Sequence, residues 1–348
     1  MRVVVDQAVP YLSHFFSSDT AVMALPASQI DADRLRGVDG LLVRSVTRVD
    51  AQLLAQTSLQ WVATATAGVD HIDAAHLAAR QIPWVAAPGC NADAVADYVL
   101  LCLAEWCHAQ GWSLRGRVAA VVGVGWVGRA VAQLLEQLGM RVLRYDPPRA
   151  SREPTFVSCA ESDLWGADLL CMHLPYTTTG PDATHHWLNA DRLMALPATC
   201  LIINAGRGGC VDMAALHQAP QPVILDVWSN EPEIVPTDVA RAWLATPHIA
   251  GYSAAAKFSA TERVHQQLVQ LGVTGICPVP LPRPPHLPLC DIDQAQWVSE
   301  LRNIIPLLSL SAEFKTAVAR GEPAAEFTAL RRHYPLRPAF VLHRSDEI

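Results

Sequence analysis

Two stretches of the sequence could together supply an acid/base group. The stretch ATPHIAGYS (245–253) places His248 after a Thr-Pro pair and before a Gly-Tyr pair. Upstream, ILDVWSNEP (224–232) carries Glu231 just before a proline. An isolated histidine is most often structural or exposed. A carboxylate that orients its imidazole and stabilises the protonated form would, however, let His248 exchange a proton near neutral pH.

A third stretch could bind an anion. INAGRGGCVD (203–212) places Arg207 in a glycine-flanked loop after a strand-like run. A guanidinium offers the bidentate geometry that a carboxylate prefers. Taken alone, a loop arginine is more often a solvated surface group. With His248 as base, Arg207 would complete the groups that oxidation of a hydroxyacid requires, apart from the hydride acceptor.

The hydride acceptor is indicated by a glycine pattern. Gly123, Gly125 and Gly128 follow the strand-like run VAAVV and precede a helical stretch that ends near Gly139. In a dinucleotide-binding loop, the first glycine permits the tight turn and the second lets backbone N–H groups approach the pyrophosphate. The third lets helix and strand pack closely. The pattern alone is a weak signal, but its position between strand and helix favours a dinucleotide site.

The second strand of this region indicates which dinucleotide binds. RVLRY (141–145) is followed by Asp146, where a carboxylate can accept hydrogen bonds from the ribose hydroxyls. Because that carboxylate would repel a 2′-phosphate, we expect NAD as the cofactor. Arg149 lies close by and could weaken this preference, although Pro147 and Pro148 restrict its approach.

Two N-terminal loops add candidate substrate contacts. Arg44 and Ser45 follow the run GLLV, and a cation there favours a phosphorylated substrate. Thr66, Ala67 and Gly68, in TATAGVDHID, could form a nest of backbone N–H groups for an anion. Each loop taken singly could equally be a polar strand terminus.

Short apolar runs alternate with Ala/Leu-rich stretches, which predicts parallel sheets covered by helices. We expect two Rossmann-like, doubly wound α/β domains with a cleft between them. Residues 1–93 and 252–277 would form the flavodoxin-like substrate domain, and 94–251 the NAD-binding domain. A long helix from about 93 to 110 would join them. The proline-dense 278–289 would be an extended linker that joins neither sheet nor helix. Residues 290–348 would form a small α+β segment that gains stability by packing on a partner.

Composition excludes several other classes of protein. No apolar run reaches the roughly 20 residues of a membrane span, and the N-terminus lacks a secretory pattern. The net charge is −7 and the basic residues are scattered, which argues against nucleic-acid binding. The nine cysteines form no CxxC pair, so we expect no metal site and a cytoplasmic location.

Taken together, these stretches resemble the D-2-hydroxyacid dehydrogenase family. The resemblance covers residues 1 to about 275 and continues more weakly into the tail. It rests on motifs that follow the family's order: VRSVT, TATAGVDHID, APGCNADAV, GVGWVG, DPPRA, NAGRGG, LDVWSNEPE and PHIAGY. Within the family, APGCNA and DPPRA favour a member that oxidises 4-phospho-D-erythronate at C2 to 2-oxo-3-hydroxy-4-phosphobutanoate, a step toward pyridoxal 5′-phosphate.

The resemblance implies roles for individual residues. The catalytic residues would be Arg207, Glu231 and His248, with His248 as the acid/base. Ser45, Thr66 and Tyr252 would contact substrate, together with Arg44, Ala67 and Gly68 from the loops above. NAD would be held by Gly123, Gly125, Trp126, Val127, Gly128, Asp146, Ala205, Gly206, Arg207, Asp226 and Gly251. The tail would be a homodimerisation domain.

Two positions and the length of the tail depart from the family pattern, and two other functions remain open. Gly206 replaces a usual Ser, Ala or Cys, which could loosen the loop of Arg207. Leu174 replaces a usual cofactor-contacting Thr, and the tail ends early. One alternative is another D-2-hydroxyacid dehydrogenase, such as one acting on 3-phosphoglycerate. The other is an NAD(H)-sensing, co-repressor-like binding protein without catalysis.

Overall fold

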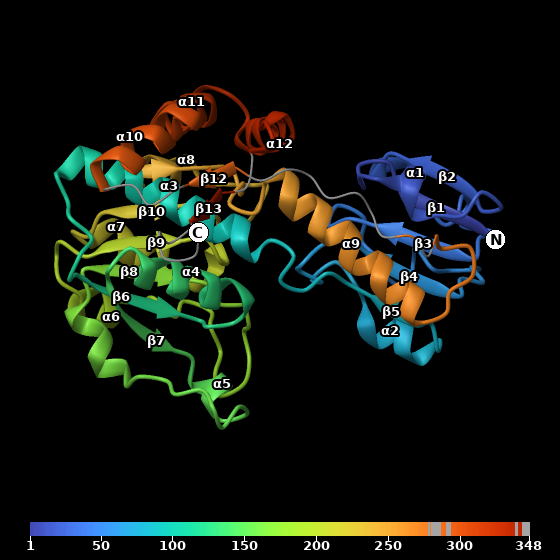
Figure 1. The fold of residues 1–348 in the computed structure, drawn as a ribbon, viewed down its shortest axis with the longest axis horizontal. Helices are drawn as coiled ribbons and strands as arrows, with labels where there is room; N and C mark the ends of the chain where they lie inside the picture. The colour runs from blue at the N-terminus through green and yellow to red at the C-terminus, as the bar shows by residue number, and fades with distance from the viewer. Residues whose placement is uncertain (278, 280–286, 290–293, 338–339, 343–348) are drawn as a thin grey trace. The chain divides into compact units, whose positions relative to one another are not determined.

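A computed structural model of the chain describes residues 1–277, 279, 287–289, 294–337 and 340–342. The chain divides into two compact units. The first unit comprises Met1–Asn91 and Ser253–His286, and the second comprises Ala92–Tyr252 and Leu287–Ile348. Figure 1 shows the elements of each unit.

The first unit is built on a five-stranded parallel sheet in the order β2-β1-β3-β4-β5. This order is flavodoxin-like. Its central strands are buried on both faces, as their continuous apolar runs predict. Its elements are β1 (Arg2–Asp6), α1 (Leu12–Phe15), β2 (Ala21–Leu25), η1 (Ala27–Gln29), β3 (Gly40–Val43), β4 (Trp61–Thr64), α2 (Ala74–Ala79), β5 (Trp84–Val85) and α9 (Ala254–Gln270).

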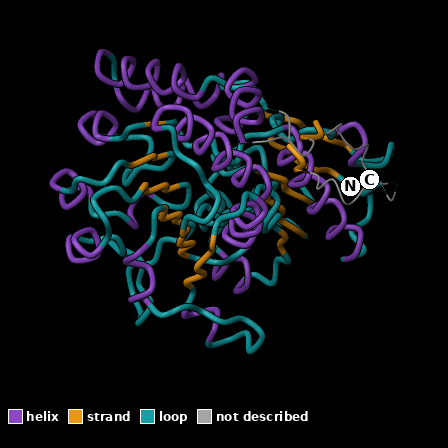
Figure 2. Tube along the Cα trace, turned by 60° about the vertical axis from the view of Figure 1, so that its left-hand side comes forward, coloured by secondary structure: helices purple, strands orange, loops and turns teal. Residues whose placement is uncertain are grey.

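The second unit contains a six-stranded parallel sheet in the order β11-β10-β9-β8-β6-β7. Figure 2 shows helices lying outside its strands. Its elements up to residue 245 are α3 (Ala92–Gln110), β6 (Val118–Val122), α4 (Trp126–Gln137), β7 (Arg141–Tyr145), α5 (Pro147–Ala150), η2 (Glu161–Gly166), β8 (Leu169–Met172), α6 (Ala190–Ala195), β9 (Leu201–Asn204), η3 (Gly208–Cys210), α7 (Met213–Gln218), β10 (Val223–Leu225), α8 (Pro236–Arg241) and β11 (Leu244–Ala245).

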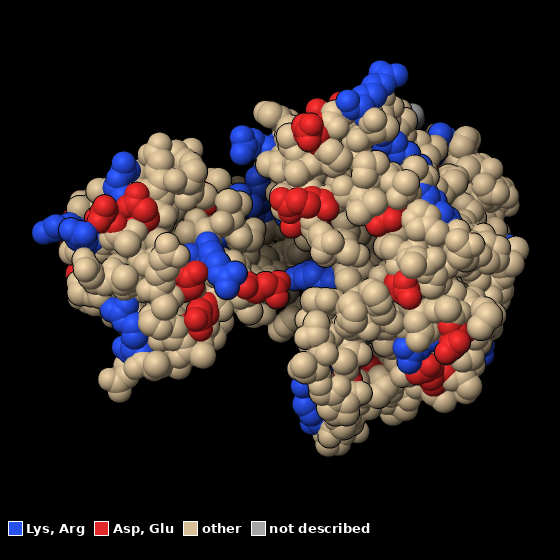
Figure 3. Space-filling view, turned by 180° about the vertical axis from the view of Figure 1, so that it is seen from behind, with Lys and Arg blue, Asp and Glu red and all other residues tan. Residues whose placement is uncertain are grey.

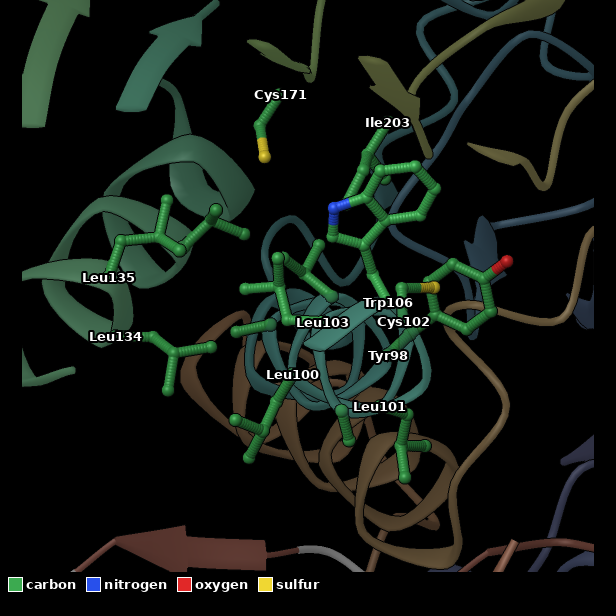
Figure 4. Close-up of a cluster of buried hydrophobic side chains, with 14 of the residues drawn as sticks. Tyr98, Leu100, Leu101, Cys102, Leu103, Trp106, Leu134, Leu135, Cys171 and Ile203 are labelled. Carbon is green, nitrogen blue, oxygen red and sulfur yellow. The ribbon is translucent and has the colours of Figure 1, made fainter. Parts of the chain in front are cut away.

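Helix α3 is buried along nearly its whole length. Tyr98, Leu100, Leu101 and Leu103 are each at most 1% exposed, and Figure 4 shows them in one cluster with side chains from α4, β8 and β9. A helix that is apolar on all sides must lie inside the protein. Its polar Glu105 is 2% exposed and pairs with Arg302 of the C-terminal segment.

The C-terminal segment packs onto the second unit through α10 (Gln294–Ile304), α11 (Leu307–Arg320) and α12 (Pro323–His333). Leu301 joins the core that contains α3, and Arg302 Nε lies 2.6 Å from Glu105 Oε2. Phe314 and Phe327 pack on the other side of the sheet. The segment therefore has a structural partner within its own chain, and its role in dimerisation stays a prediction.

The expected fold class is confirmed: both units are α/β structures with parallel sheets. The expected long helix is α3, and the strand-like runs VAAVV and RVLRY are β6 and β7. The cleft between the domains stays a prediction.

The expectation that the proline-dense segment joins no sheet is wrong at its end. Leu287–Leu289 forms β12, which pairs in parallel with β13 (Phe340–Leu342) despite Pro288. Proline is tolerated there because a two-stranded sheet has only edge strands, whose outer N–H groups need no partner. Residues 278 and 280–286 of the segment lie outside the described residues.

Figure 3 shows both signs of charge interspersed on the visible face, without a dense basic block. Among the described residues, no helix has the length and apolar character required to cross a bilayer.

Candidate functional site

The predicted cofactor and catalytic residues of the second unit follow the carboxyl ends of its strands. Because all six strands are parallel, these ends lie along one edge of the sheet. Strand β6 pairs with β7 on one side and β8 on the other, so chain order reverses there. In open α/β sheets, ligands bind outside the carboxyl ends of strands at such a switch point. The glycine loop begins directly after β6.

The glycine loop has the geometry of a dinucleotide cradle. Gly123 has φ +82°, and a Cβ there would lie 2.8 Å from His173 O. At Gly128, a Cβ would lie 2.0 Å from Gly123 O, so helix α4 approaches the turn more closely than any side chain permits. At Gly125, a Cβ would meet no described atom within 4 Å. The loop thus has no room for a side chain at Gly123 and Gly128, whereas it is open at Gly125. An opening at the second glycine lets backbone N–H groups approach a pyrophosphate, which fits NAD. Trp126 and Val127 begin α4 beside it.

Asp146 connects the end of β7 to this loop. Its Oδ2 accepts a hydrogen bond from Val124 N at 2.8 Å, and Oδ1 accepts one from Arg149 N at 3.0 Å. The side chain is only half-buried. Since each carboxylate oxygen has two lone pairs, Asp146 retains acceptor capacity for ribose hydroxyls.

The loop after β9 contains Ala205, Gly206 and Arg207. Asn204 supports it at both ends: its Oδ1 accepts from Gly206 N at 3.1 Å, and its Nδ2 donates to Arg207 O at 3.1 Å. A Cβ at Gly206 would lie 3.1 Å from both His173 Cα and Leu174 N, so the small residue allows close packing on the neighbouring loop. The guanidinium of Arg207 donates to Gly206 O at 2.9 Å.

Asp226, at the end of β10, organises the loop that carries His248. Its fully buried carboxylate accepts from Thr246 Oγ1 and Ile249 N, each at 2.7 Å, and from Ala250 N at 2.9 Å. Burial raises the pKa of Asp226, while His248 and these three donors act in the opposite direction. Asp226 thus positions the loop of His248. The expected contact between Asp226 and NAD stays a prediction.

Glu231 and His248 are directly hydrogen-bonded. His248 Nδ1 lies 2.6 Å from Glu231 Oε2, and Glu231 Oε1 accepts from Trp228 N at 2.9 Å. Burial acts to raise the pKa of Glu231, but His248, the Trp228 N–H and the charge of Arg331 together hold it below its usual range. Glu231 is therefore ionised at neutral pH and fixes the imidazole through Nδ1.

The backbone also constrains His248. Its φ is +56°, a left-handed conformation that is uncommon for residues other than glycine. The His248 N–H donates to Asp226 O at 2.8 Å, which holds this conformation. Non-glycine residues in such regions gather at functional sites, where the surrounding structure supports the strain.

The arginine loop and the glutamate loop pack together at one glycine. A Cβ on Gly208 would lie 2.0 Å from Trp228 C, so only a glycine permits this approach. The structure thus brings the loop of Arg207 against the loop that begins with Trp228 and reaches Glu231. Within the described residues, no group of His, Cys, Asp and Glu side chains is arranged to hold a metal.

Sequence reasoning missed Arg337, which supports the loop after His248 from the C-terminal segment. Arg337 is 3% exposed, and its Nη1 donates to Ile249 O and Tyr252 O, each at 3.1 Å. Its Nη2 donates to the carbonyl oxygens of Ala94 and Ala250. These contacts surround Gly251. No local pattern in the sequence distinguishes this arginine from its exposed neighbours.

The candidate substrate residues of the first unit lie at the ends of β3 and β4. Thr66 Oγ1 donates to Gly68 O at 2.8 Å and lies 2.8 Å from Thr64 Oγ1, which holds the loop containing Ala67. Arg44 is half-buried and Ser45 is exposed.

A second cation near Arg44 was also missed by sequence reasoning. Lys257 lies on the first turn of α9, and its pKa is lowered by burial and then by the charge of Arg44. The same unit therefore places two cations close enough to repel each other. Neighbouring cations of this kind favour binding of an anion.

Comparison with known proteins identifies close relatives. Residues 101–250 match the family model "D-isomer specific 2-hydroxyacid dehydrogenase, NAD binding domain". The erythronate-4-phosphate dehydrogenase of Chromohalobacter salexigens is 38% identical, over 99% of this chain and 94% of that protein. The enzyme of the same name from Aeromonas salmonicida is 40% identical, over 97% of this chain and 93% of its own length.

A solved structure supports the fold. The NAD+-bound 3-phosphoglycerate dehydrogenase of Entamoeba histolytica superposes with a TM-score of 0.64 at 20% identity, over 81% of this chain and 99% of that one. At this identity the likeness concerns the fold alone.

Proposed function

Because the chain belongs to the D-isomer specific 2-hydroxyacid dehydrogenase family, we propose that it oxidises C2 of 4-phospho-D-erythronate with NAD. The product would be 2-oxo-3-hydroxy-4-phosphobutanoate, and the step would serve pyridoxal 5′-phosphate biosynthesis. The reaction type is best supported by one observation, the 2.6 Å contact between His248 Nδ1 and Glu231 Oε2.

His248 is the acid/base in this proposal. Because Glu231 engages Nδ1, the hydroxyl proton of the substrate passes to Nε2. The resulting imidazolium is stabilised by the ionised Glu231. In the reverse direction, the same Nε2 returns the proton to the carbonyl oxygen.

Arg207 orients the substrate. Its guanidinium binds the carboxylate beside C2 through two parallel hydrogen bonds and polarises the carbonyl oxygen that forms. Ser45, Tyr252 and the 66–68 loop are proposed as further substrate contacts. Arg44, together with Lys257, is proposed to bind the 4-phosphate, because the charge of Arg44 acts on Lys257 and neighbouring cations attract an anion.

The glycine loop, Asp146 and the 205–207 loop are proposed to hold NAD. When bound, NAD accepts the hydride from C2. The glycine loop and the 205–207 loop would hold NAD at the carboxyl edge of the sheet, where the loop of His248 also begins. We further propose that the enzyme acts in the cytoplasm as a homodimer formed through residues 290–348.

The test is to follow the reduced-nicotinamide absorbance of the purified chain with NAD and either 4-phospho-D-erythronate or 3-phosphoglycerate, with a trap for the 2-oxoacid product. We expect NADH to form with the erythronate compound and much more slowly with the other acid. Activity with 3-phosphoglycerate alone would reassign the substrate. NADH binding without turnover of either acid would favour the binding-protein function.

A further inference from the structure

Arg149 lies where a dinucleotide's adenosine ribose would be recognised. It belongs to α5, three positions after Asp146, and its Nη1 donates to Val124 O in the glycine loop at 2.7 Å. Its guanidinium also lies 4.1 Å from the centroid of the Phe156 ring. Asp146 bonds to the N–H groups of both Val124 and Arg149, so the three residues meet at one place.

This arrangement combines two opposite determinants of cofactor choice. A carboxylate at the end of the second strand accepts the ribose 2′-hydroxyl of NAD, whereas a nearby arginine accommodates the 2′-phosphate of NADP. Asp146 is the first determinant, and Arg149 has the residue type and position of the second. A guanidinium binds phosphate through a fork of two N–H groups. Arg149 can therefore bind a 2′-phosphate only when no other acceptor engages that fork.

In the structure, Glu153 engages that fork. Arg149 Nε donates to Glu153 Oε2 at 2.6 Å, and Nη2 donates to Glu153 Oε1 at 2.8 Å. The hydrogen bond from Arg149, the largest effect, holds the pKa of Glu153 below its usual range, so the carboxylate is ionised at neutral pH. With Nη1 directed to Val124 O, the guanidinium is both neutralised and oriented within its own chain.

We propose that Glu153 is a specificity-determining residue that preserves the preference for NAD by engaging the guanidinium of Arg149, which would otherwise bind the 2′-phosphate of NADP. Glu153 acts through Arg149 and is a positioning residue. This inference rests on the proposed use of NAD. It adds a residue outside the glycine loop to the features that select the cofactor.

The test is to measure binding of NADH and NADPH to the full chain by calorimetry, before and after Glu153→Gln. Glutamine preserves the shape of a side chain that is 44% exposed, so the variant should fold. We expect it to bind NADPH about tenfold more tightly than the unmodified protein does, the scale of one charge-assisted hydrogen bond. NADH affinity should be unchanged. Binding of 2′,5′-ADP, which carries the phosphate without the nicotinamide, should strengthen in parallel.

Two variants separate this effect from a general change of charge. Glu136→Gln removes the same charge from another bidentate pair, in which both contacts of Glu136 with Arg144 are 2.8 Å long. It should not alter NADPH binding. The double variant Arg149→Met/Glu153→Gln should lose the gain, because no guanidinium remains.

In Glu153→Gln, the carboxylate of Asp146 would still repel the 2′-phosphate of NADPH. A further pair of variants removes this repulsion. Asp146→Asn/Glu153→Gln should bind NADPH more tightly than Asp146→Asn alone. If neither Glu153→Gln nor this double variant gains NADPH affinity, or if Glu136→Gln gains equally, the proposal is overturned. If the unmodified protein binds no NADH, the proposed function itself fails. If NADH binds normally but no variant gains NADPH affinity, only the proposed role of Glu153 is overturned.

Discussion

Arg337 donates a 3.1 Å hydrogen bond from Nη1 to the backbone oxygen of Tyr252, although 85 residues separate them in the chain. The same guanidinium reaches Ile249 O, Ala250 O and Ala94 O. The C-terminal segment thereby supports the loop that follows His248. This contact gives the segment a role in the site that does not depend on a second subunit.

Replacing Arg337 with methionine should therefore lower both stability and turnover. Methionine fills part of the volume but removes all four hydrogen bonds that the guanidinium donates, which we expect to cost about 2 to 4 kcal/mol of unfolding free energy. Urea unfolding of the full chain measures the loss. Arg320→Met, at an exposed position of α11, is the control and should change stability little. Equal stability of the two variants would contradict this role for Arg337.

The acid/base assignment is tested by His248→Asn. Asparagine tolerates the left-handed backbone that His248 adopts, so the loop should keep its shape. We expect turnover to fall by roughly 10²-fold or more with NADH binding retained. His217→Asn is a matched control, because His217 pairs with Asp238 at 2.8 Å and its side chain is 31% exposed, as is that of His248. The assignment fails if His248→Asn turns over normally.

The lowered pKa of Glu231 predicts a pH dependence of stability. A carboxyl group whose pKa is lower in the folded state stabilises the protein fully above its unfolded-state value, near 4.5, and this contribution disappears as pH falls through the folded value. The stability difference between the unmodified protein and Glu231→Gln should thus be largest near neutral pH and shrink in acid. Urea unfolding at several pH values measures it. A difference that grows in acid would have the wrong sign.

The glycine loop predicts two distinct outcomes for two alanine substitutions. Gly128→Ala places a methyl group 2.0 Å from Gly123 O, and we expect it to destabilise the unit by about 1 to 3 kcal/mol and to abolish NADH binding. Gly125→Ala meets no described atom within 4 Å, so stability should be kept while NADH binding weakens. Calorimetry and thermal unfolding of both variants distinguish the two effects. Unchanged NADH binding in Gly125→Ala would argue against this loop as the pyrophosphate site.

Arg207→Lys tests the proposed contact with the substrate carboxylate. Lysine keeps the charge but cannot form two parallel hydrogen bonds, so we expect kcat/KM to fall by at least about tenfold and NADH affinity to fall much less. Steady-state kinetics with 4-phospho-D-erythronate provide the measurement. If kcat/KM is retained, a single cation suffices and the bidentate contact is absent.

The sequence alone determined the parts of this protein that depend on local physical rules. The glycine loop is recognisable because only glycine permits the turn at 123 and the close packing at 128. Asp146 is recognisable because it ends a short apolar run at the expected distance from that loop. The alternation of apolar runs and helical stretches predicted two parallel-sheet units because it reflects strands buried on both faces.

Only the tertiary structure decided the contacts between residues that are distant in sequence or lack a local pattern. Asp226 is buried beneath the loop of His248, and Arg337 reaches the same loop from the C-terminal segment. The strand at Leu287–Leu289 depends on a partner near the end of the chain. Arg149 and Glu153 are four residues apart and pair locally, but the contact of Arg149 with Val124 O in the glycine loop depends on the fold. Such contacts follow from how packed elements place side chains in space, and side-chain type and spacing do not encode that placement.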